Sequence, residues 1–185
     1  MTQSRDAAIQ TCHDLFVNET SEELDALQRL IDRSVASSGA HLLGIVTAPR
    51  RLSARQLVAA VTGMKVIVVA TVTAAGEPRT SCADGHFLSG TWTFSTDSGA
   101  HKARQLRARP AVSVTHVDGE RLAVFTHGRA ELTTARDPGF QAFEDHFVNH
   151  YGSSPREWSP DPVFIRVRPT WMIGFAMNAH EFPAA

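Results

Sequence analysis

A strand that ends in two hydroxyl residues and runs into a basic helix is the part of this chain best suited to chemistry. In the stretch Thr91–Leu106, TWTFSTDSGAHKARQL, Ser95 and Thr96 close an alternating strand. After a glycine turn, Lys102 and Arg104 fall at the start of a short helix. Two hydroxyls, two cations and free helix-start N–H groups at one point are how proteins hold a phosphate. The stretch therefore predicts a phosphate-binding site.

Composition places the chain among ordinary globular domains. With 185 residues, 43% hydrophobic and 20% charged, it is long enough to bury one sizeable core. Its net charge of -1 gives no bulk electrostatic reason to expect a nucleic-acid or membrane partner. The strongest apolar run, Val66–Ala70, is too short to span a bilayer, and the N-terminus does not read as a secretory signal. Cys12 and Cys82 lie far apart without CxxC spacing, so we expect a reducing, cytoplasmic setting.

Helical patterns mark the first third of the chain. Residues 1–19 carry only a faint helical spacing and predict a loose arm or a segment that covers a partner. Thr20 opens a capping-box pattern ahead of a helix over Ser21–Ala36. Ser53 opens a second such pattern, and the helix after it should run to about Gly63.

Beyond the second helix the pattern becomes that of strands. Ala74–Glu77 is a glycine turn and Asp118–Gly119 a strong hairpin signal. The expected strands are Val66–Thr73, Pro78–Asp84, Thr91–Thr96, Ala111–Val117, Leu122–Leu132, Val163–Val167 and Thr170–Met177. The expected helices are His101–Arg107 and Asp137–Tyr151, the latter capped by Asp137 with Pro138 at its first position. Closely spaced strands with helices outside predict a mainly β (α+β) antiparallel barrel, with an N-terminal arm and helices over residues 1–63 and the barrel over residues 64–185.

Nine histidines raise the question of a metal. His146 and His150 stand four residues apart on a predicted helix, but HExxH is absent and no cysteine or carboxylate is placed to complete a site. A solvated or partner-facing helix explains that spacing better, so we expect no metal. His86, His116 and His127 lie on or beside predicted strands, and His127 is the best placed to face a cofactor groove.

No side chain is marked as an acid, base or nucleophile. A Cys82 nucleophile would need a neighbouring base and a lowered pKa, so packing in the core is the better interpretation. The strand aromatics Trp92, Phe94, Phe125 and Phe164 are predicted core residues.

The order of four segments resembles the pyridoxamine 5'-phosphate oxidase-like superfamily, the flavin-binding split β-barrels. These segments are ATVTAAGEPRTS, DGHFLSGTWTFST, HKARQLRARPAVSVTHVDG and GRAEL. Within that superfamily, Phe94–Leu106 is similar to the actinobacterial flavin/deazaflavin-dependent oxidoreductases, group B, in which a strand ending in Ser precedes a Lys-x-Arg-x-Leu helix. The resemblance covers roughly Met64–Met177 and implies a six-stranded split β-barrel with flanking helices.

The resemblance also implies a homodimer with FMN or the deazaflavin F420 in a groove between the subunits. The matching cofactor-binding positions are Arg79, Thr80, Ser81, Ser95, Thr96, Lys102, Arg104, Gln105, His127 and Trp171, the last two approaching from the other subunit. The Arg-x-His substrate signature of the true pyridoxamine phosphate oxidases is missing, and the apolar strand Trp171–Met177 stands there instead. This departure argues against vitamin B6 chemistry.

The implied activity is hydride transfer from the reduced cofactor to a small conjugated substrate, with the cofactor carrying the chemistry. Arg107 and Arg109 extend the cations of the helix, and such a strip suits the polyanionic tail of F420, although a solvated Arg-rich helix is the alternative. Two non-catalytic functions stay open: a flavin-storage protein, or a haem-binding split barrel with a histidine as axial ligand.

Overall fold

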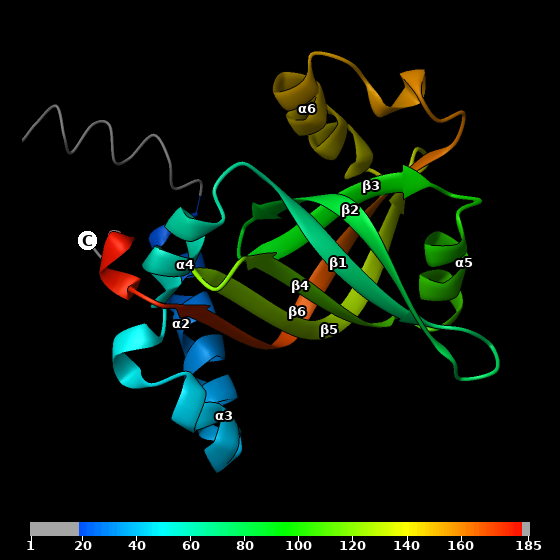
Figure 1. Ribbon diagram of the computed structural model, residues 1–185. Helices are drawn as coiled ribbons and strands as arrows, with labels where there is room; N and C mark the ends of the chain where they lie inside the picture. The colour runs from blue at the N-terminus through cyan, green and yellow to red at the C-terminus, as the bar shows by residue number, and fades with distance from the viewer. Residues whose placement is uncertain (1–18, 183–185) are drawn as a thin grey trace, which may run out of the picture.

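In a computed structural model, which describes residues 19–182, the chain forms a closed barrel of six antiparallel strands (Figure 1). The order around the barrel is β1-β2-β3-β6-β5-β4. The strands are β1 Met64–Val72, β2 Pro78–Leu88, β3 Thr91–Asp97, β4 Ala111–Asp118, β5 Leu122–Thr134 and β6 Pro162–Ala176. The predicted mainly β fold is confirmed. The arm expected over residues 1–19 lies, except for its last residue, outside the described part of the chain.

The last strand differs from the prediction. Where two strands were expected, β6 runs unbroken from Pro162 to Ala176 and pairs with β3 over its first half and with β5 along its length. At the place of the expected break, β6 continues, and only its pairing with β5 changes register, between His127 and Gly128 of β5. A Cβ on Gly128 would stand 2.1 Å from the carbonyl oxygen of Arg168. Glycine therefore lets the two strands stay in contact through the irregularity.

The N-terminal helices pack on one end of the barrel. Helix α2, Ser21–Ala36, begins at the predicted capping box and lies against β6. Helix α4, Ala54–Ala60, also begins at its predicted box but ends before Gly63, which has a positive φ of 76°. Buried residues of both helices and of the barrel, Trp92 among them, form one hydrophobic cluster. Between these helices lie α3, Ala40–Ile45, and a short 3-10 turn, Ala48–Arg50.

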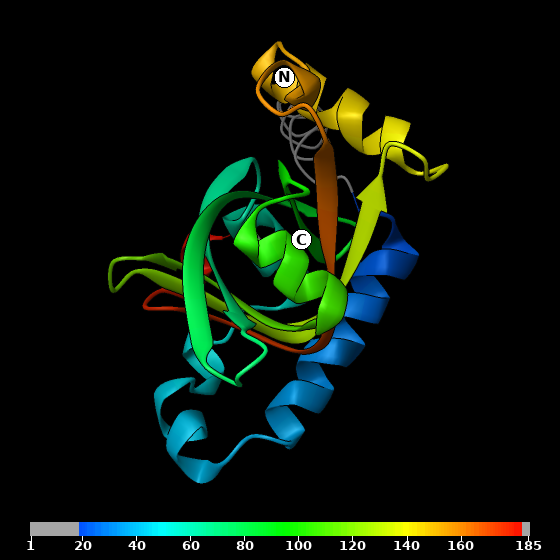
Figure 2. The same ribbon diagram turned by 90° about the vertical axis from the view of Figure 1, so that its right-hand side faces the viewer.

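Helix α5, His101–Ala108, closes the opposite end of the barrel (Figures 1 and 2). Its buried residues Ala103 and Leu106 belong to the same hydrophobic cluster as the barrel interior. The helix is therefore anchored by one apolar face, and its polar face is presented beside β1 and β2. None of the described helices is long and apolar enough to cross a membrane.

Helix α6, Phe140–Tyr151, lies over β2 and β3 (Figure 1). The predicted start at Asp137 is wrong, because the Asp137 carboxylate accepts hydrogen bonds from the backbone N and hydroxyl of Thr134 at 2.7 and 2.8 Å. That carboxylate closes a turn after β5, and Gly139 is the N-cap. Phe140 and Phe147 pack on Phe164 of β6, which fixes the helix on the barrel wall. The short 3-10 turns Pro155–Glu157 and Ala179–Glu181 complete the described structure.

Candidate functional site

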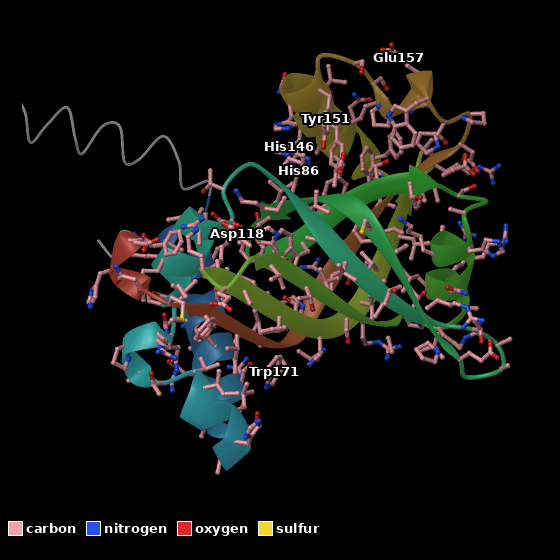
Figure 3. The ribbon with its side chains drawn as sticks, viewed as in Figure 1. His86, Asp118, His146, Tyr151, Glu157 and Trp171 are labelled. Carbon is pink, nitrogen blue, oxygen red and sulfur yellow. The ribbon has the colours of Figure 1, made fainter. Side chains whose placement is uncertain are left out.

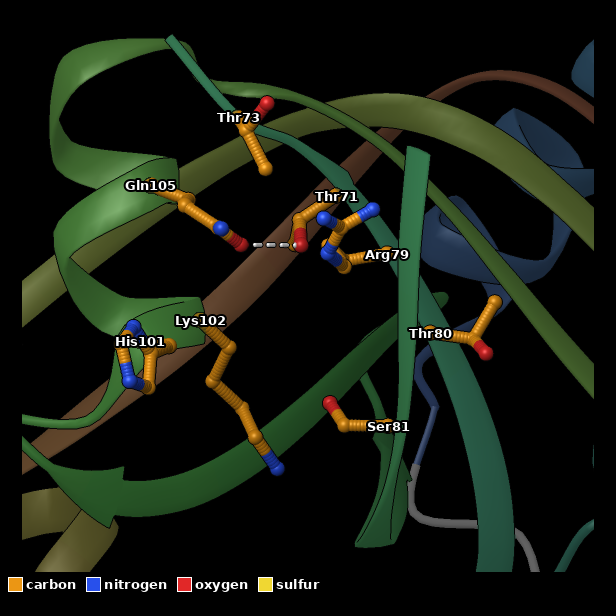
Figure 4. Close-up of a pocket in the computed structure, with 8 residues that line it drawn as sticks. All are labelled: Thr71, Thr73, Arg79, Thr80, Ser81, His101, Lys102 and Gln105. Carbon is orange, nitrogen blue, oxygen red and sulfur yellow. Dashed lines mark hydrogen bonds between the residues drawn. The ribbon is translucent and has the colours of Figure 1, made fainter. Parts of the chain in front are cut away.

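A pocket of about 490 Å³ lies where helix α5 faces the β1–β2 hairpin (Figure 4). We name it the α5 pocket. Its lining residues are Thr71 and Thr73 of β1 and the following turn, Arg79, Thr80 and Ser81 of β2, and His101, Lys102 and Gln105 of α5. Five of the ten predicted cofactor-binding residues, Arg79, Thr80, Ser81, Lys102 and Gln105, therefore meet around one pocket.

Lys102 is the cation that the fold holds most firmly in this pocket. It stands at the second position of α5, and the burial of Ala103 beside it anchors that turn. The ammonium Nζ donates a hydrogen bond of 2.8 Å to the carbonyl oxygen of Cys82 on β2. Partial burial lowers the pKa of Lys102, with smaller opposing effects from Cys82 and Asp84. An anion bound beside Lys102 would favour the charged form and offset that cost.

Two further contacts shape the pocket. The hydroxyl of Thr71 donates to the side-chain oxygen of Gln105 at 2.6 Å, which joins β1 to α5 (Figure 4). Arg79, on the exposed side of β2, forms an ion pair with Glu77 at 2.6 Å. An exposed pair of this kind is weak, so the Arg79 guanidinium can exchange its partner for a bound anion at little cost.

Three other predicted residues lie outside the α5 pocket. Ser95 lines a neighbouring pocket, and its hydroxyl donates to the carbonyl oxygen of Val163 at 3.4 Å. Thr96 pairs with Val163 within the sheet. The guanidinium of Arg104 turns back along α5 to the Gly99 carbonyl and the His101 ring. The structure therefore separates Arg104 from Lys102, although both stand on the same short helix.

His127 and Trp171 form a pair elsewhere on the barrel. They are opposite each other on β5 and β6, and their rings stack with centroids 4.8 Å apart and an interplanar angle of 22°. The Trp171 Nε1 donates to the carbonyl oxygen of Ser34 on α2 at 3.2 Å. Neither residue lines the α5 pocket of its own chain. Their expected approach from a second subunit remains a prediction.

A second pocket of about 360 Å³, the α6 pocket, lies between helix α6 and the outer surface of β2 and β3. Its lining residues are Asp84, Ser95, Phe147, Tyr151, Ser153, Pro155 and Trp158. The two pockets are neighbours along β2, since Ser81 lines one and Asp84 the other. Cys82 lies between them and is exposed, so the prediction that it packs in the core is wrong. The residues in the first half of β2 are exposed or half-buried, and Cys82 is one of the exposed residues.

His86 lies under helix α6 and contacts two histidines of that helix, His146 and His150; Figure 3 shows His86 beside His146. His86 of β2 is only 2% exposed, and its Nδ1 lies 3.0 Å from the Nε2 of His146. The ring of His150 stands edge-on to His86 with centroids 4.8 Å apart. His146 is therefore half-buried against the barrel, where a solvated or partner-facing surface was expected, whereas His150 is exposed as that expectation requires. Among residues 19–182, no group of three His, Cys, Asp or Glu side chains is arranged to hold a metal ion.

The sequence did not point to several residues of these pockets. Thr71, Thr73 and His101 line the α5 pocket. Thr71 could have been found from the hairpin, because a turn at Gly76 pairs Thr71 with Arg79 in the register of β1 and β2. Tyr151 had no such signal, since its position depends on how α6 docks.

Solved structures confirm the fold. A conserved hypothetical protein from Mycobacterium tuberculosis is 17% identical, with 80% of this chain and 90% of that chain covered and a TM-score of 0.52. The General Stress Protein 26 from Bacillus anthracis is 16% identical, with 73% and 94% covered and a TM-score of 0.51. A heme binding protein from Mycobacterium smegmatis is 18% identical, with 66% and 56% covered and a TM-score of 0.51. At these identities the likeness concerns the fold alone.

A search of curated proteins finds no match to this chain. The family model described as "Pyridoxamine 5'-phosphate oxidase" matches residues 53–175, which is more than half of the sequence. This match agrees with the closed six-stranded barrel and with the order of motifs along the chain. The chain therefore belongs to the pyridoxamine 5'-phosphate oxidase family.

Proposed function

We propose that this protein binds a phosphorylated flavin or deazaflavin in the α5 pocket and acts as an oxidoreductase on a small conjugated substrate. One observation carries the proposal. Lys102, Arg79 and the hydroxyls of Thr80 and Ser81 come from two different elements and line one pocket in a chain of this family. Cations and hydroxyls around one cavity are a phosphate-binding set.

The residues fit such a group. A half-buried ammonium on the first turn of α5 supplies charge where the helix also presents unpaired N–H groups. Gln105, held by Thr71, adds an amide that can orient a polar chain. The bound cofactor would supply hydride transfer, and the protein would bind it, orient it and keep one face dry.

The choice between FMN and F420 depends on the cations beyond Lys102. Helix α5 ends at Ala108, so the helical strip expected to reach Arg109 does not form. Arg109 instead leaves in extended backbone and donates from Nε to the carbonyl oxygen of Val72 at 3.1 Å. Val72 stands between Thr71 and Thr73, which line the α5 pocket, so this guanidinium is bonded to the backbone of a segment that contributes to the pocket. A further cation beside Lys102 and Arg79 suits the anionic tail of F420, and we propose F420 in preference to FMN.

The absorbance spectrum of the purified protein, followed by titration with FMN and with F420, tests the proposal. Binding of either cofactor, and oxidation of its reduced form by a conjugated acceptor, would support it. A bound flavin without any reductase activity would favour a storage protein, and a Soret band after haem addition would favour the haem-binding alternative. Binding of none of the three would contradict the proposal and both alternatives.

We also propose that the protein is a homodimer. In the apolar segment Trp171–Met177, Met172 and Ile173 are completely buried by the same chain, so these two side chains cannot contact a second copy. Exposed apolar side chains lie instead on the neighbouring strands β1 and β4: Val66 is 54%, Val68 42% and Val117 54% exposed. Val68 pairs with Thr115, so these valines share the outer face of the two strands. A second copy covering that face would bury them.

A further inference from the structure

A chain of three side chains joins the α6 pocket to another pocket on the far side of helix α6. The hydroxyl of Tyr151, which lines the α6 pocket, lies 3.0 Å from the Nε2 of His86. The other ring nitrogen of His86, Nδ1, lies 3.0 Å from the Nε2 of His146. His146 lines a pocket of about 210 Å³ that Glu19 and His150 also line. Figure 3 shows Tyr151, His146 and His86 next to one another.

The chemistry of imidazole gives this chain a direction. A neutral histidine has one N–H and one bare nitrogen, so His86 donates to one neighbour and accepts from the other. If Nε2 carries the proton, His86 donates to the Tyr151 oxygen and accepts from His146. The Tyr151 O–H is then directed away from His86 and toward Asp84 in the wall of the α6 pocket, and it can donate to an acceptor that binds there in place of Asp84.

The surroundings keep these groups in the required states. Burial, with the nearby His146 and His150, lowers the pKa of His86 to about 4, so it is neutral near pH 7. Burial and the neighbouring Asp84 raise the pKa of Tyr151 to about 12, so its proton is retained at rest. The ionisable groups around the chain are Asp84 on β2, His146 and His150 on α6, and Glu19 ahead of α2.

We infer that Tyr151 is the proton donor that accompanies hydride transfer to an acceptor in the α6 pocket, and that His86 and His146 resupply its proton from the opposite pocket. This inference depends on the proposed function, because the reduced flavin or deazaflavin is the hydride source. The acceptor is a small molecule with a conjugated double bond. The α6 pocket suits it, because Phe147, Tyr151 and Trp158 give aromatic walls next to the α5 pocket.

The step balances in atoms and charge. The hydride brings two electrons to one atom of the double bond, and the other atom takes the hydroxyl proton of Tyr151. The phenolate oxygen then takes the proton from His86 Nε2. His86 Nδ1 takes the proton of His146 Nε2, and His146 takes one from water. The acceptor is reduced by two electrons, the cofactor is oxidised by two, and one proton is drawn from solvent.

A measurement on the cofactor-free protein tests the chain without any turnover. Nitrogen NMR of isotope-labelled histidine should show His86 neutral at pH 7 with its proton on Nε2. In Tyr151→Phe that signal should move, because the Nε2–H loses its acceptor. A proton on Nδ1 would mean that Tyr151 donates to His86 and has no proton for the pocket, which would overturn the inference.

Kinetics test the donor role itself. Hydride transfer from reduced F420 or FMN to menadione or cyclohexenone should slow by roughly a hundredfold or more in Tyr151→Phe, with cofactor affinity unchanged. His86→Gln should reduce the solvent deuterium isotope effect and shift the pH profile, since His86 acts through Tyr151. The control His180→Gln, which removes an exposed histidine on the 3-10 turn Ala179–Glu181 outside this cluster, should leave both as in the wild type.

The outcomes separate the two proposals. A wild-type protein that reduces both probes, with Tyr151→Phe equally fast, would overturn the donor role and leave the proposed function standing. A wild-type protein that binds cofactor but reduces neither probe would contradict the proposed function and the donor role together, whatever the NMR shows.

Discussion

Thr71 and Gln105 are joined by a 2.6 Å hydrogen bond, in which the threonine hydroxyl donates to the amide oxygen across the floor of the α5 pocket (Figure 4). Thr71 is only 3% exposed, so this bond is protected from water. Because the amide oxygen is engaged, the Nε2 end of Gln105 is directed away from Thr71 as a donor. The pair thus connects the stability of the β1–α5 contact to the orientation of a pocket side chain.

Replacing Thr71 with valine should therefore affect both properties. Thr71→Val removes the donor while keeping the shape, and leaves the Gln105 oxygen without this partner. The free energy of unfolding should fall by about 1 kcal/mol, and cofactor affinity should fall as the amide loses its orientation. Thr71→Ser keeps the hydroxyl and should stay close to the wild type. Denaturant unfolding and cofactor titration check this, and wild-type values for Thr71→Val in both would contradict it.

The ion pair between Arg79 and Glu77 should compete with cofactor binding. Both side chains are more than half exposed, so Glu77→Gln should change the free energy of unfolding by no more than about 0.5 kcal/mol. It also frees the guanidinium for an anion in the α5 pocket, so FMN and F420 should bind more tightly. The matched control is Glu131→Gln, which breaks the equally exposed Arg168–Glu131 pair away from the pocket. If Glu77→Gln and Glu131→Gln changed the cofactor affinity equally, the effect would not come from the release of Arg79 in the α5 pocket.

The buried His86 should make stability depend on pH. Its pKa is about 4 in the folded protein and near 6.5 when exposed, so between these values the unfolded chain binds the extra proton. Stability should therefore be lost as the pH falls from about 6.5 to 4, at up to roughly 1.4 kcal/mol per pH unit for this one group. His146, whose pKa burial also lowers, acts in the same direction.

A comparison of His86→Gln with the wild type isolates the His86 contribution, because the acidic groups are common to both. Denaturant unfolding at several pH values should give the variant a shallower slope across that window. Parallel slopes for the two proteins would show that His86 does not titrate as its surroundings require.

The proposed dimer predicts a position-specific effect of charge. Val68→Glu places a carboxylate on the exposed apolar face of β1 and should convert the dimer to a monomer in sedimentation at micromolar concentration. Ile45→Glu, at an equally exposed position on α3, should leave the dimer intact. A wild-type monomer under the same conditions would contradict the proposal directly.

Local sequence signals predicted much of this fold. The capping boxes at Thr20 and Ser53 mark the observed helix starts, because both sides of each box lie within four residues. The hairpins were predictable because their turns contain glycine with positive φ, as at Gly76 and Gly119. The predicted helix start at Asp137 was wrong because an aspartate carboxylate can either cap a helix or close a turn. In this structure it accepts from the backbone N–H of Thr134 and closes a turn.

The site was predictable only where neighbours in sequence remain neighbours in space. Lys102 and Gln105 share a face of α5, and Arg79 to Ser81 share a strand, so both groups reach one pocket. Arg104 could not be excluded, because the direction of its side chain depends on the Gly99 carbonyl. The link from Tyr151 through His86 to His146 brings together residues about 60 positions apart, as the docking of α6 dictates, and no spacing in the sequence encodes it.

Calorimetric titration of FMN and F420 into the wild type and Lys102→Ala tests most directly whether the α5 pocket holds the cofactor phosphate. Loss of a charge-assisted contact should weaken binding of either cofactor by about 1.5–3 kcal/mol while stability barely changes. Arg107→Ala removes an exposed cation of the same helix that does not line the pocket, and should bind almost as the wild type. F420 affinity should also fall more steeply with salt than FMN affinity, because its tail meets a further cation. Binding by Lys102→Ala as tight as by the wild type would contradict the account.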